Sequence, residues 1–169
     1  MARTICLIVV LVLASCSTTR NISVEKYQPV SIQEFLDSPF GHDESIASFQ
    51  KHFPKQVKIQ KSIRKNTHYP EKVDTIYKFY HKSSEVFVYK TYFNREMVFG
   101  GVITTDKMPL INGIVPGISR DQFFKAFTNL KPEQKDSILL DNRKEMRKFI
   151  FIFSKSDKLK KISFSSYID

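Results

Sequence analysis

The side chains best suited to catalysis or metal binding are few in this chain of 169 residues, and their spacing favours neither activity. Serines 45, 119 and 137 lack the G-x-S-x-G context of a nucleophile elbow. No two histidines have the H-x-x-x-H or H-E-x-x-H spacing that places two zinc ligands on one helix face. We expect no enzyme activity, no cofactor and no metal site. Four histidines are expected to be solvated or satisfied in the core: His42, His52, His68 and His81.

Both cysteines lie near the N-terminus, at Cys6 and Cys16, so the rest of the chain has no thiol to pair or react. Residues 1–3 carry a positive charge and residues 5–14 are apolar. Ten apolar residues are about half of what a helix needs to cross a bilayer, which favours a secretory signal over a membrane span. The alternatives are an ordinary signal peptide and an uncleaved anchor.

The end of this segment, residues 13–16 (LASC), resembles the bacterial lipobox. In proteins with a lipobox the signal peptide is removed before the cysteine, whose sulfur receives a diacylglycerol. The resemblance implies that residues 1–15 are a signal peptide and that Cys16 is the lipidated first residue. Two or three acyl chains hold a protein stably on a membrane. We therefore expect a protein anchored in the cell envelope and facing the periplasm. Ser17 favours the outer membrane over the inner one.

Residues 16–169 are basic. Arg3 is the one charged residue that precedes them, so they contain 26 Lys and Arg against 17 Asp and Glu, a net charge of +9. An exported protein meets little nucleic acid, so anionic lipid, acidic glycan or an acidic protein face is the expected partner. The alternative is a solvated lysine-rich surface that serves solubility alone. No nucleic acid and no small-molecule substrate is predicted.

Periodicity predicts an α+β fold in which short helices pack on antiparallel sheet. Residues 16–30 are polar and are predicted to form a tether. Helices are expected at residues 31–36, 46–53 and 118–127. Strands are expected at residues 57–59, 73–81, 85–93, 96–105, 137–140, 146–154 and 159–167.

The helix and hairpins occur twice, and the two occurrences share a spacing. Phe49-x-Lys51-x-Phe53 recurs as Phe123-x-Lys125-x-Phe127, 74 positions later, and Phe79 and Phe153 are also 74 apart. This favours a tandem repeat, with a first module over residues 31–110 and a second over residues 111–169. The alternative is a single α+β domain whose strands merely look alike.

Tyrosine and lysine side chains crowd two neighbouring predicted strands. Tyrosine buries a large area at low entropic cost and still forms hydrogen bonds, so it suits a protein interface. The alternative is that these rings belong to the core or to cross-strand pairs. The predicted partner-binding residues are Tyr77, Tyr80, Tyr89 and Tyr92 with Lys78 and Lys90.

Residues 117–124 (GISRDQFF) resemble the segment before the amphipathic helix of small outer-membrane-assembly lipoproteins of the BamE/SmpA type. The paired modules are similar in outline to the β-lactamase-inhibitor-protein-like fold. The chain departs from that family in lacking Gly-x-Pro after the helix. The resemblance implies a non-catalytic, lipid-anchored protein that binds a protein partner of the envelope. The alternatives are an inhibitor or immunity protein against a secreted or toxic enzyme, and an accessory protein that binds an acidic glycan or lipid.

Overall fold

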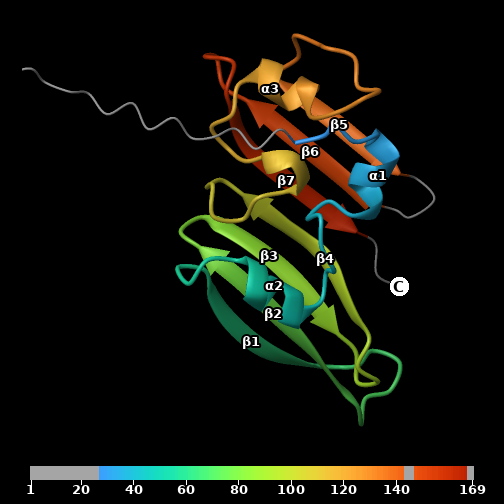
Figure 1. Ribbon diagram of the computed structural model, residues 1–169. Coiled ribbons are helices and arrows are strands. Elements are labelled where there is room, and N and C mark those ends of the chain that lie inside the picture. The colour runs from blue at the N-terminus through green and yellow to red at the C-terminus, as the bar shows by residue number, and fades with distance from the viewer. Residues whose placement is uncertain (1–26, 143–146, 167–169) are drawn as a thin grey trace, which may run out of the picture.

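The computed structural model describes residues 27–142 and 147–166 (Figure 1). Within them the fold is α+β, as predicted: a seven-stranded antiparallel sheet with a few short helices. The helices are α1 (Ile32–Asp37), α2 (Ile46–His52), η1 (Ile111–Gly113) and α3 (Arg120–Lys125). The strands are β1 (Lys58–Lys65), β2 (Val73–His81), β3 (Ser84–Lys90), β4 (Glu96–Ile103), β5 (Ser137–Asn142), β6 (Arg147–Phe153) and β7 (Leu159–Ser166).

The predicted signal peptide, Cys16 and most of the predicted tether lie outside the described residues. Within residues 27–142 and 147–166, no helix has the length and apolar character needed to cross a bilayer.

The strands form one sheet in the order β1-β2-β3-β4-β7-β6-β5. Strands β1 to β4 come from residues 31–110 and strands β5 to β7 from residues 111–169, so both predicted modules contribute to the same sheet. They meet where β4 pairs with β7, with Gly100 opposite Ser165 and Ile103 opposite Ile162. Backbone hydrogen bonds therefore run without a break from one half to the other.

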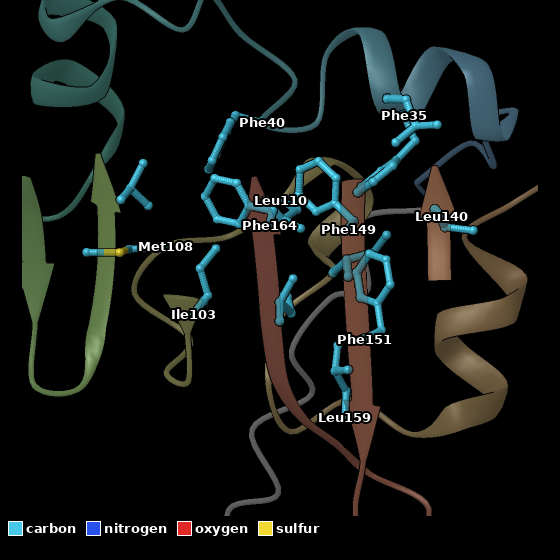
Figure 2. Close-up of a cluster of buried hydrophobic side chains, with 14 of the residues drawn as sticks. Phe35, Phe40, Ile103, Met108, Leu110, Leu140, Phe149, Phe151, Leu159 and Phe164 are labelled. Carbon is cyan, nitrogen blue, oxygen red and sulfur yellow. The ribbon is translucent and has the colours of Figure 1, made fainter. Parts of the chain in front are cut away.

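The three α-helices lie on one face of the sheet, which we call the helix side (Figure 1). Phenylalanine dominates the core between the two layers. Phe35 of α1 lies 5.0 Å from Phe149 of β6 between ring centroids, and the two rings meet edge to face (Figure 2). The ring centroid of Phe40 lies 5.9 Å from that of Phe164 in β7 and 4.8 Å from that of Phe49 in α2, so one core extends over both halves of the sheet.

Equivalent ring contacts anchor the other two helices. Phe49 of α2 packs 5.4 Å from Phe79 of β2, and Phe123 of α3 packs 5.3 Å from Phe153 of β6. Edge-to-face and tilted aromatic pairs of this kind add about 0.5–1.5 kcal/mol each beyond the area they bury.

Side-chain caps define where each α-helix begins. Ser31 and Glu34 form a capping box on α1, Ser119 and Gln122 form one on α3, and Ser45 caps α2. Helices of six or seven residues are too short to be stable alone in water, so packing on the sheet must hold them.

A close backbone approach explains the glycines in β4. A Cβ atom on Gly101 would lie 2.5 Å from the carbonyl oxygen of Glu85 and 2.6 Å from the ring of Phe164. The register between β3 and β4 shifts beside this site, between Phe87 and Val88. A side chain at position 101 therefore has no room beside this register shift.

The chain enters the fold beside α3. Val30 forms a parallel bridge with Phe127, in which its N–H donates to the carbonyl of Ala126 at 3.1 Å and its own carbonyl accepts from Thr128 at 2.8 Å. The first described residues are therefore fixed to the second half of the sequence before α1 begins.

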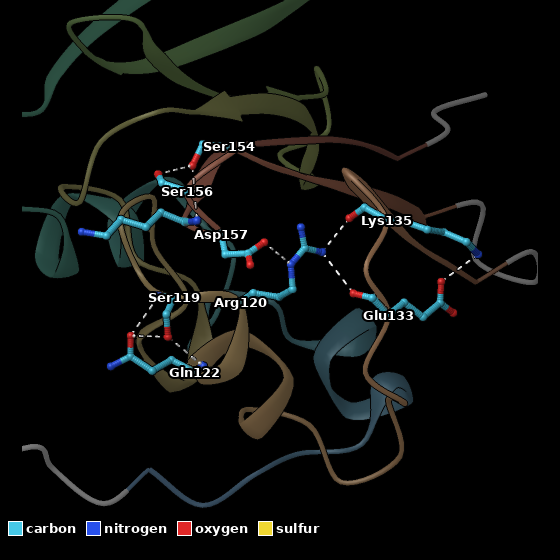
Figure 3. A network of polar contacts seen from close by, with 9 residues as sticks. Ser119, Arg120, Gln122, Glu133, Lys135, Ser154, Ser156 and Asp157 are labelled. Carbon is cyan, nitrogen blue, oxygen red and sulfur yellow. Dashed lines mark hydrogen bonds and ion pairs between the residues drawn. The ribbon is translucent and has the colours of Figure 1, made fainter.

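A buried arginine fixes the loop that follows α3 (Figure 3). The Nε of Arg120 donates to Asp157 at 2.8 Å, and Nη1 donates to the carbonyls of Glu133 and Lys135 at 3.1 and 2.6 Å. The guanidinium also stacks on the ring of Phe153. Arg120 thus joins the β6 and β7 hairpin to the loop before β5.

Two strands differ in kind from the prediction, beyond small shifts at the ends of the other elements. Strand β1 extends to Lys65, whereas the sequence predicted only residues 57–59, because its exposed, lysine-rich second half has no apolar alternation to signal a strand. Strand β3 ends at Lys90 and residues 91–95 form a turn, in which the N–H groups of Thr91 and Asn94 donate to the carbonyls of Arg95 and Thr91. Residues 91–93 had been predicted to continue the strand.

Candidate functional site

The face of the sheet opposite the helices, which we call the open face, is covered by no helix or strand of the described residues (Figure 1). The pairing register of β2 and β3 shows which of their side chains point to the open face. Buried Phe79 and Val86 pair on the helix side, so their neighbours Lys78 and Phe87, which also pair, point to the open face. The open face is therefore where a large sheet surface meets solvent.

A hollow of about 770 Å³ lies on the open face, at the end of the sheet where β2 begins and β3 ends. We call it the aromatic hollow. Its floor is formed by strand residues such as Tyr89 and Phe99, and its walls by the loops that connect β1 to β2 and β3 to β4. The residues that characterise it are Arg64, Tyr69, Tyr89, Tyr92, Phe93 and Arg95.

Three rings in the walls of the aromatic hollow remain exposed. Tyr69 is 53% exposed, Tyr92 39% and Phe93 59%. They also touch, since Tyr92 lies 5.8 Å from Tyr69 and 5.0 Å from Phe93 between ring centroids, both edge to face. The contacts hold the rings in place while leaving their surfaces in water, which costs free energy unless something covers them.

Asp74 organises the walls of the aromatic hollow. Its carboxylate is fully buried and accepts hydrogen bonds from the Tyr89 hydroxyl, from Asn66 Nδ2 at 2.7 Å and from the Tyr92 N–H at 2.9 Å. One side chain thus joins the β1 to β2 loop, strand β3 and the β3 to β4 loop. The wall rings are held in position before any ligand arrives, which lowers the ordering cost of binding.

The charge of Asp74 is stabilised in this position. Burial acts to raise the pKa of its carboxyl, but the three hydrogen bonds, together with the positive charge of Arg64, bring the pKa below its ordinary value. Burial and the neighbouring Asp74 carboxylate both raise the pKa of the Tyr89 hydroxyl. At neutral pH Asp74 is therefore ionised and Tyr89 is a donor, so neither is poised to transfer a proton.

Two arginines at the aromatic hollow carry positive charge. Neither Arg64 nor Arg95 forms an ion pair within 4 Å with a carboxylate of the described residues. The guanidinium group binds carboxylates in a planar, bidentate geometry. The aromatic hollow thus combines apolar rings with two guanidinium groups, of which Arg64 also acts at longer range on the Asp74 carboxylate.

The structure separates the six predicted partner-binding residues into three groups. Tyr89 and Tyr92 belong to the aromatic hollow. Lys78 and Tyr80 lie on the open face away from it, where Lys78 pairs with Glu85 at 2.6 Å and lies 5.7 Å from the ring centroid of Tyr80.

Tyr77 and Lys90 lie on the helix side. Tyr77 pairs with buried Val88 and packs against the core, and Lys90 pairs with Glu96 at 2.9 Å. These two side chains therefore cannot share a binding surface with Tyr89.

The sequence alone did not single out four of the six residues that characterise the aromatic hollow: Arg64, Tyr69, Phe93 and Arg95. They come from a strand end and two loops that only the folded sheet brings together. A signal was present in the turn sequence Phe93-Asn94-Arg95, because an aromatic residue beside a turn has no strand neighbour to cover it.

Two of the four histidines, His42 and His52, lie against each other. His42 and His52 stack at 4.1 Å between ring centroids, and Ser48 Oγ lies 2.9 Å from His42 Nδ1 and 3.3 Å from His52 Nδ1. Burial lowers the pKa of His42. Within the described residues, no group of three His, Cys, Asp or Glu side chains is arranged to hold a metal ion.

The part of the chain that the structure describes therefore has an open hollow whose exposed aromatic rings are held in place by ring contacts and by Asp74. No protein-family model, no curated protein and no solved structure matches this chain.

Proposed function

We propose that this protein is a non-catalytic envelope lipoprotein, anchored through lipid at Cys16 and facing the periplasm, that binds a protein partner with its aromatic hollow. The observation that carries the proposal is the group of exposed rings, Tyr69, Tyr92 and Phe93, fixed around a hollow on an uncovered sheet face. Tyrosine and arginine are enriched among the residues that supply most of the free energy of protein interfaces.

The partner we propose presents an acidic surface with an apolar side chain at its centre. Arg64 and Arg95 supply the positive charge that such a surface would meet, and the rings supply apolar area between them. Complementary charge speeds association and excludes basic competitors. The preformed walls around Asp74 support binding without a large ordering cost.

The anchor rests on the sequence LASC at residues 13–16 and on the polar segment that follows it. Intact mass of the protein from its native membrane, compared with that of Cys16→Ala, tests the anchor separately from binding. We expect residues 16–169 plus lipid in the wild type and no lipid in the variant. An unlipidated wild-type mass would refute the anchor and leave the binding proposal standing.

Site-specific photocrosslinking tests the binding surface. We would place a photoreactive phenylalanine analogue at Phe93 and, as the matched control, at Leu139, an exposed residue of the far edge strand β5 that is 54% exposed. We expect one stoichiometric protein partner crosslinked from position 93 and absent from position 139. The crosslink should disappear in Arg95→Glu, whose circular dichroism spectrum and urea midpoint should match those of the wild type. Equal crosslinking from both positions would contradict the proposal.

The same experiment separates the second candidate, an inhibitor or immunity protein. In that case the crosslinked partner is a secreted or toxic enzyme whose activity falls when this protein is added. An assembly module would instead crosslink to a protein of the envelope and leave its activity unaffected.

We also propose that the fold arose as a tandem repeat of a helix and a three-stranded meander. Strands β3 and β6 begin at Ser84 and Arg147, and strands β4 and β7 at Glu96 and Leu159, in both cases 63 positions apart. The antiparallel order β2-β3-β4-β7-β6-β5 is consistent with a two-fold axis between β4 and β7 that exchanges the two meanders.

The helices keep the longer spacing of 74, since their caps are Ser45 and Ser119. The spacing of 74 between the helices exceeds the spacing of 63 between the strands by 11 residues. These additional residues lie between α2 and β2, where the first module has the additional strand β1. In this scheme β2 corresponds to β5, so the spacing of 74 between Phe79 of β2 and Phe153 of β6 does not mark equivalent positions.

A further inference from the structure

We infer that strand β1 is a second interaction surface, which shares only Arg64 with the residues that characterise the aromatic hollow, and that it adds an extended acidic segment of a partner protein to the edge of the sheet. Strand β1 is the terminal strand, with β2 on one side and no described strand on the other. Its outer backbone groups are therefore available to pair with another chain.

Strand β1 lacks the usual structural protection of an edge. Natural edge strands are kept short, bulged, interrupted by proline or covered. Strand β1 has eight residues, pairs with β2 without a register shift from Lys58 to Lys65, contains no proline and is exposed along its whole length. It is a regular template for one more strand.

Charge is the one protection that β1 has, and it also selects the partner. The strand contains Lys58, Lys61, Arg64 and Lys65 and no acidic residue, and none of the four forms an ion pair with a carboxylate of the described residues. Two β1 strands brought together would set like charges opposite each other, which is destabilising. An acidic strand would instead form opposite-charge pairs along the edge.

The side-chain pattern of β1 specifies the pattern of its ligand. On the helix side Ile59 and Ile63 are 40% and 71% exposed, while Lys58 and Arg64 point to the open face. A paired strand has its own side chains alternate between the same two faces. Lys61 and Lys65 alternate with these two isoleucines on the helix side, and Gln60 and Ser62 separate Lys58 from Arg64 on the open face. The ligand that fits carries acidic residues on the open face, near Lys58 and Arg64, and apolar residues on the helix side, where they cover Ile59 and Ile63.

A synthetic peptide tests this inference without knowledge of the natural partner. The probe is an eight-residue peptide of alternating glutamate and valine with both ends blocked, titrated into the full-length protein in detergent. We expect saturable binding, with new protection from amide hydrogen exchange in residues 58–65. The corresponding lysine and valine peptide should not bind.

N-methylation distinguishes strand addition from simple charge attraction. In a paired strand alternate N–H groups point toward the neighbour. Methylating the peptide nitrogens of one alternate set should abolish binding, whereas methylating the other set should leave it within about twofold of the parent. Equal binding of both methylated peptides would overturn the inference, as would protection that appears elsewhere than in residues 58–65.

Charge variants complete the test. Lys58→Glu with Lys61→Glu should weaken peptide binding roughly tenfold or more, because the opposite-charge pair at Lys58 becomes a like-charge pair and the positive charge of Lys61, on the helix side of the same edge, is also reversed. The matched control, Lys155→Glu with Lys160→Glu, changes the net charge equally at two exposed lysines of the second half and should bind within about twofold of the wild type.

Two further outcomes identify a different occupant and would overturn the inference. The first is binding to phosphatidylglycerol vesicles that is lost in the Lys58 and Lys61 variant while the peptide fails to bind. The second is a dimer in sedimentation that the same variant abolishes. Phe93→Ala should leave peptide binding unchanged, so the edge and the aromatic hollow are tested independently.

Discussion

The guanidinium carbon of Arg120 lies 4.3 Å from the ring centroid of Phe153, between α3 and the end of β6. The same group donates to Asp157 and to two backbone carbonyls, so a single buried side chain satisfies three acceptors. Its role is structural, and it links the helix, the hairpin and the loop before β5.

Replacing this arginine should destabilise the whole fold. Arg120→Met keeps most of the apolar volume but leaves two carbonyls without their donor, which should lower the free energy of unfolding by about 2–4 kcal/mol. Urea denaturation measures the change. Lys125→Met is the control in the same helix, because that lysine is exposed and its ion pair with Asp121 contributes little. Equal midpoints for the two variants would contradict the assigned role.

Removing the charge of Asp74 should loosen the aromatic hollow. Asp74→Asn retains the shape, but its single side-chain oxygen cannot replace two accepting carboxylate oxygens, so its NH2 group faces at least one donor and that hydrogen bond is lost. The expected cost is about 1–3 kcal/mol. Amide hydrogen exchange should then rise in residues 66–69 and 91–95, which Asp74 holds together. Asp106→Asn is the matched control, since that carboxylate is on the surface and pairs with Lys107.

Asp74 also predicts how stability depends on pH. Its pKa is lower in the folded protein than in the unfolded chain, so the unfolded chain takes up a proton first as the pH falls. The stabilisation is present above about pH 4, the ordinary pKa of an aspartate, and is lost as the pH falls through the lower folded value. The urea midpoint of Asp74→Asn should therefore fall less steeply below pH 4 than that of the wild type.

His42 should produce a second pH dependence at higher pH. Burial lowers its pKa in the fold, and the nearby His52 acts in the same direction. The unfolded chain therefore binds a proton first, and stability should fall as the pH drops below about 6.5, the ordinary histidine value. His42→Gln should flatten this slope between pH 7 and 5, and His68→Gln, in an exposed loop, should preserve it. An NMR titration that places the His42 pKa at or above 6.5 would contradict the prediction.

The two glycines at Gly101 and Gly117 should respond differently to alanine. At Gly101 the added methyl group would contact backbone and the Phe164 ring at less than 3 Å, so Gly101→Ala should cost about 2 kcal/mol or more. At Gly117 the space is open, but its φ of +106° is unfavourable for alanine, so the cost should be about 1–2 kcal/mol. The midpoints of thermal unfolding of the two variants show which substitution destabilises the fold more.

Local patterns were sufficient to predict the fold class and most elements. Ser31 and Ser119 mark helix starts because a cap is a short-range interaction between residues three positions apart. The β2 to β4 meander was predicted because its strands are rich in β-branched and aromatic residues. Strand β1 was largely missed, since an exposed edge has no buried face to impose an apolar alternation.

The candidate site was less predictable because it depends on register and on loops. Tyr77 and Tyr89 look equivalent in sequence, yet pairing places one on the helix side and the other on the open face. Arg64 and Phe93 are 29 positions apart and become neighbours only when β1, β2 and β3 align. Neither relationship can be read from composition or from a single strand.

The bridge between Val30 and Phe127 determines which part of the fold first bears tension applied to the N-terminal chain. Tension along the N-terminal chain reaches the two backbone hydrogen bonds at Ala126 and Thr128 before it reaches α1. The load is thus transferred to the α3 end of the second half, and from there through the continuous ladder of the sheet. A partner seated on the distant β1 to β4 end would pull against the full width of the sheet rather than peel away its first helix.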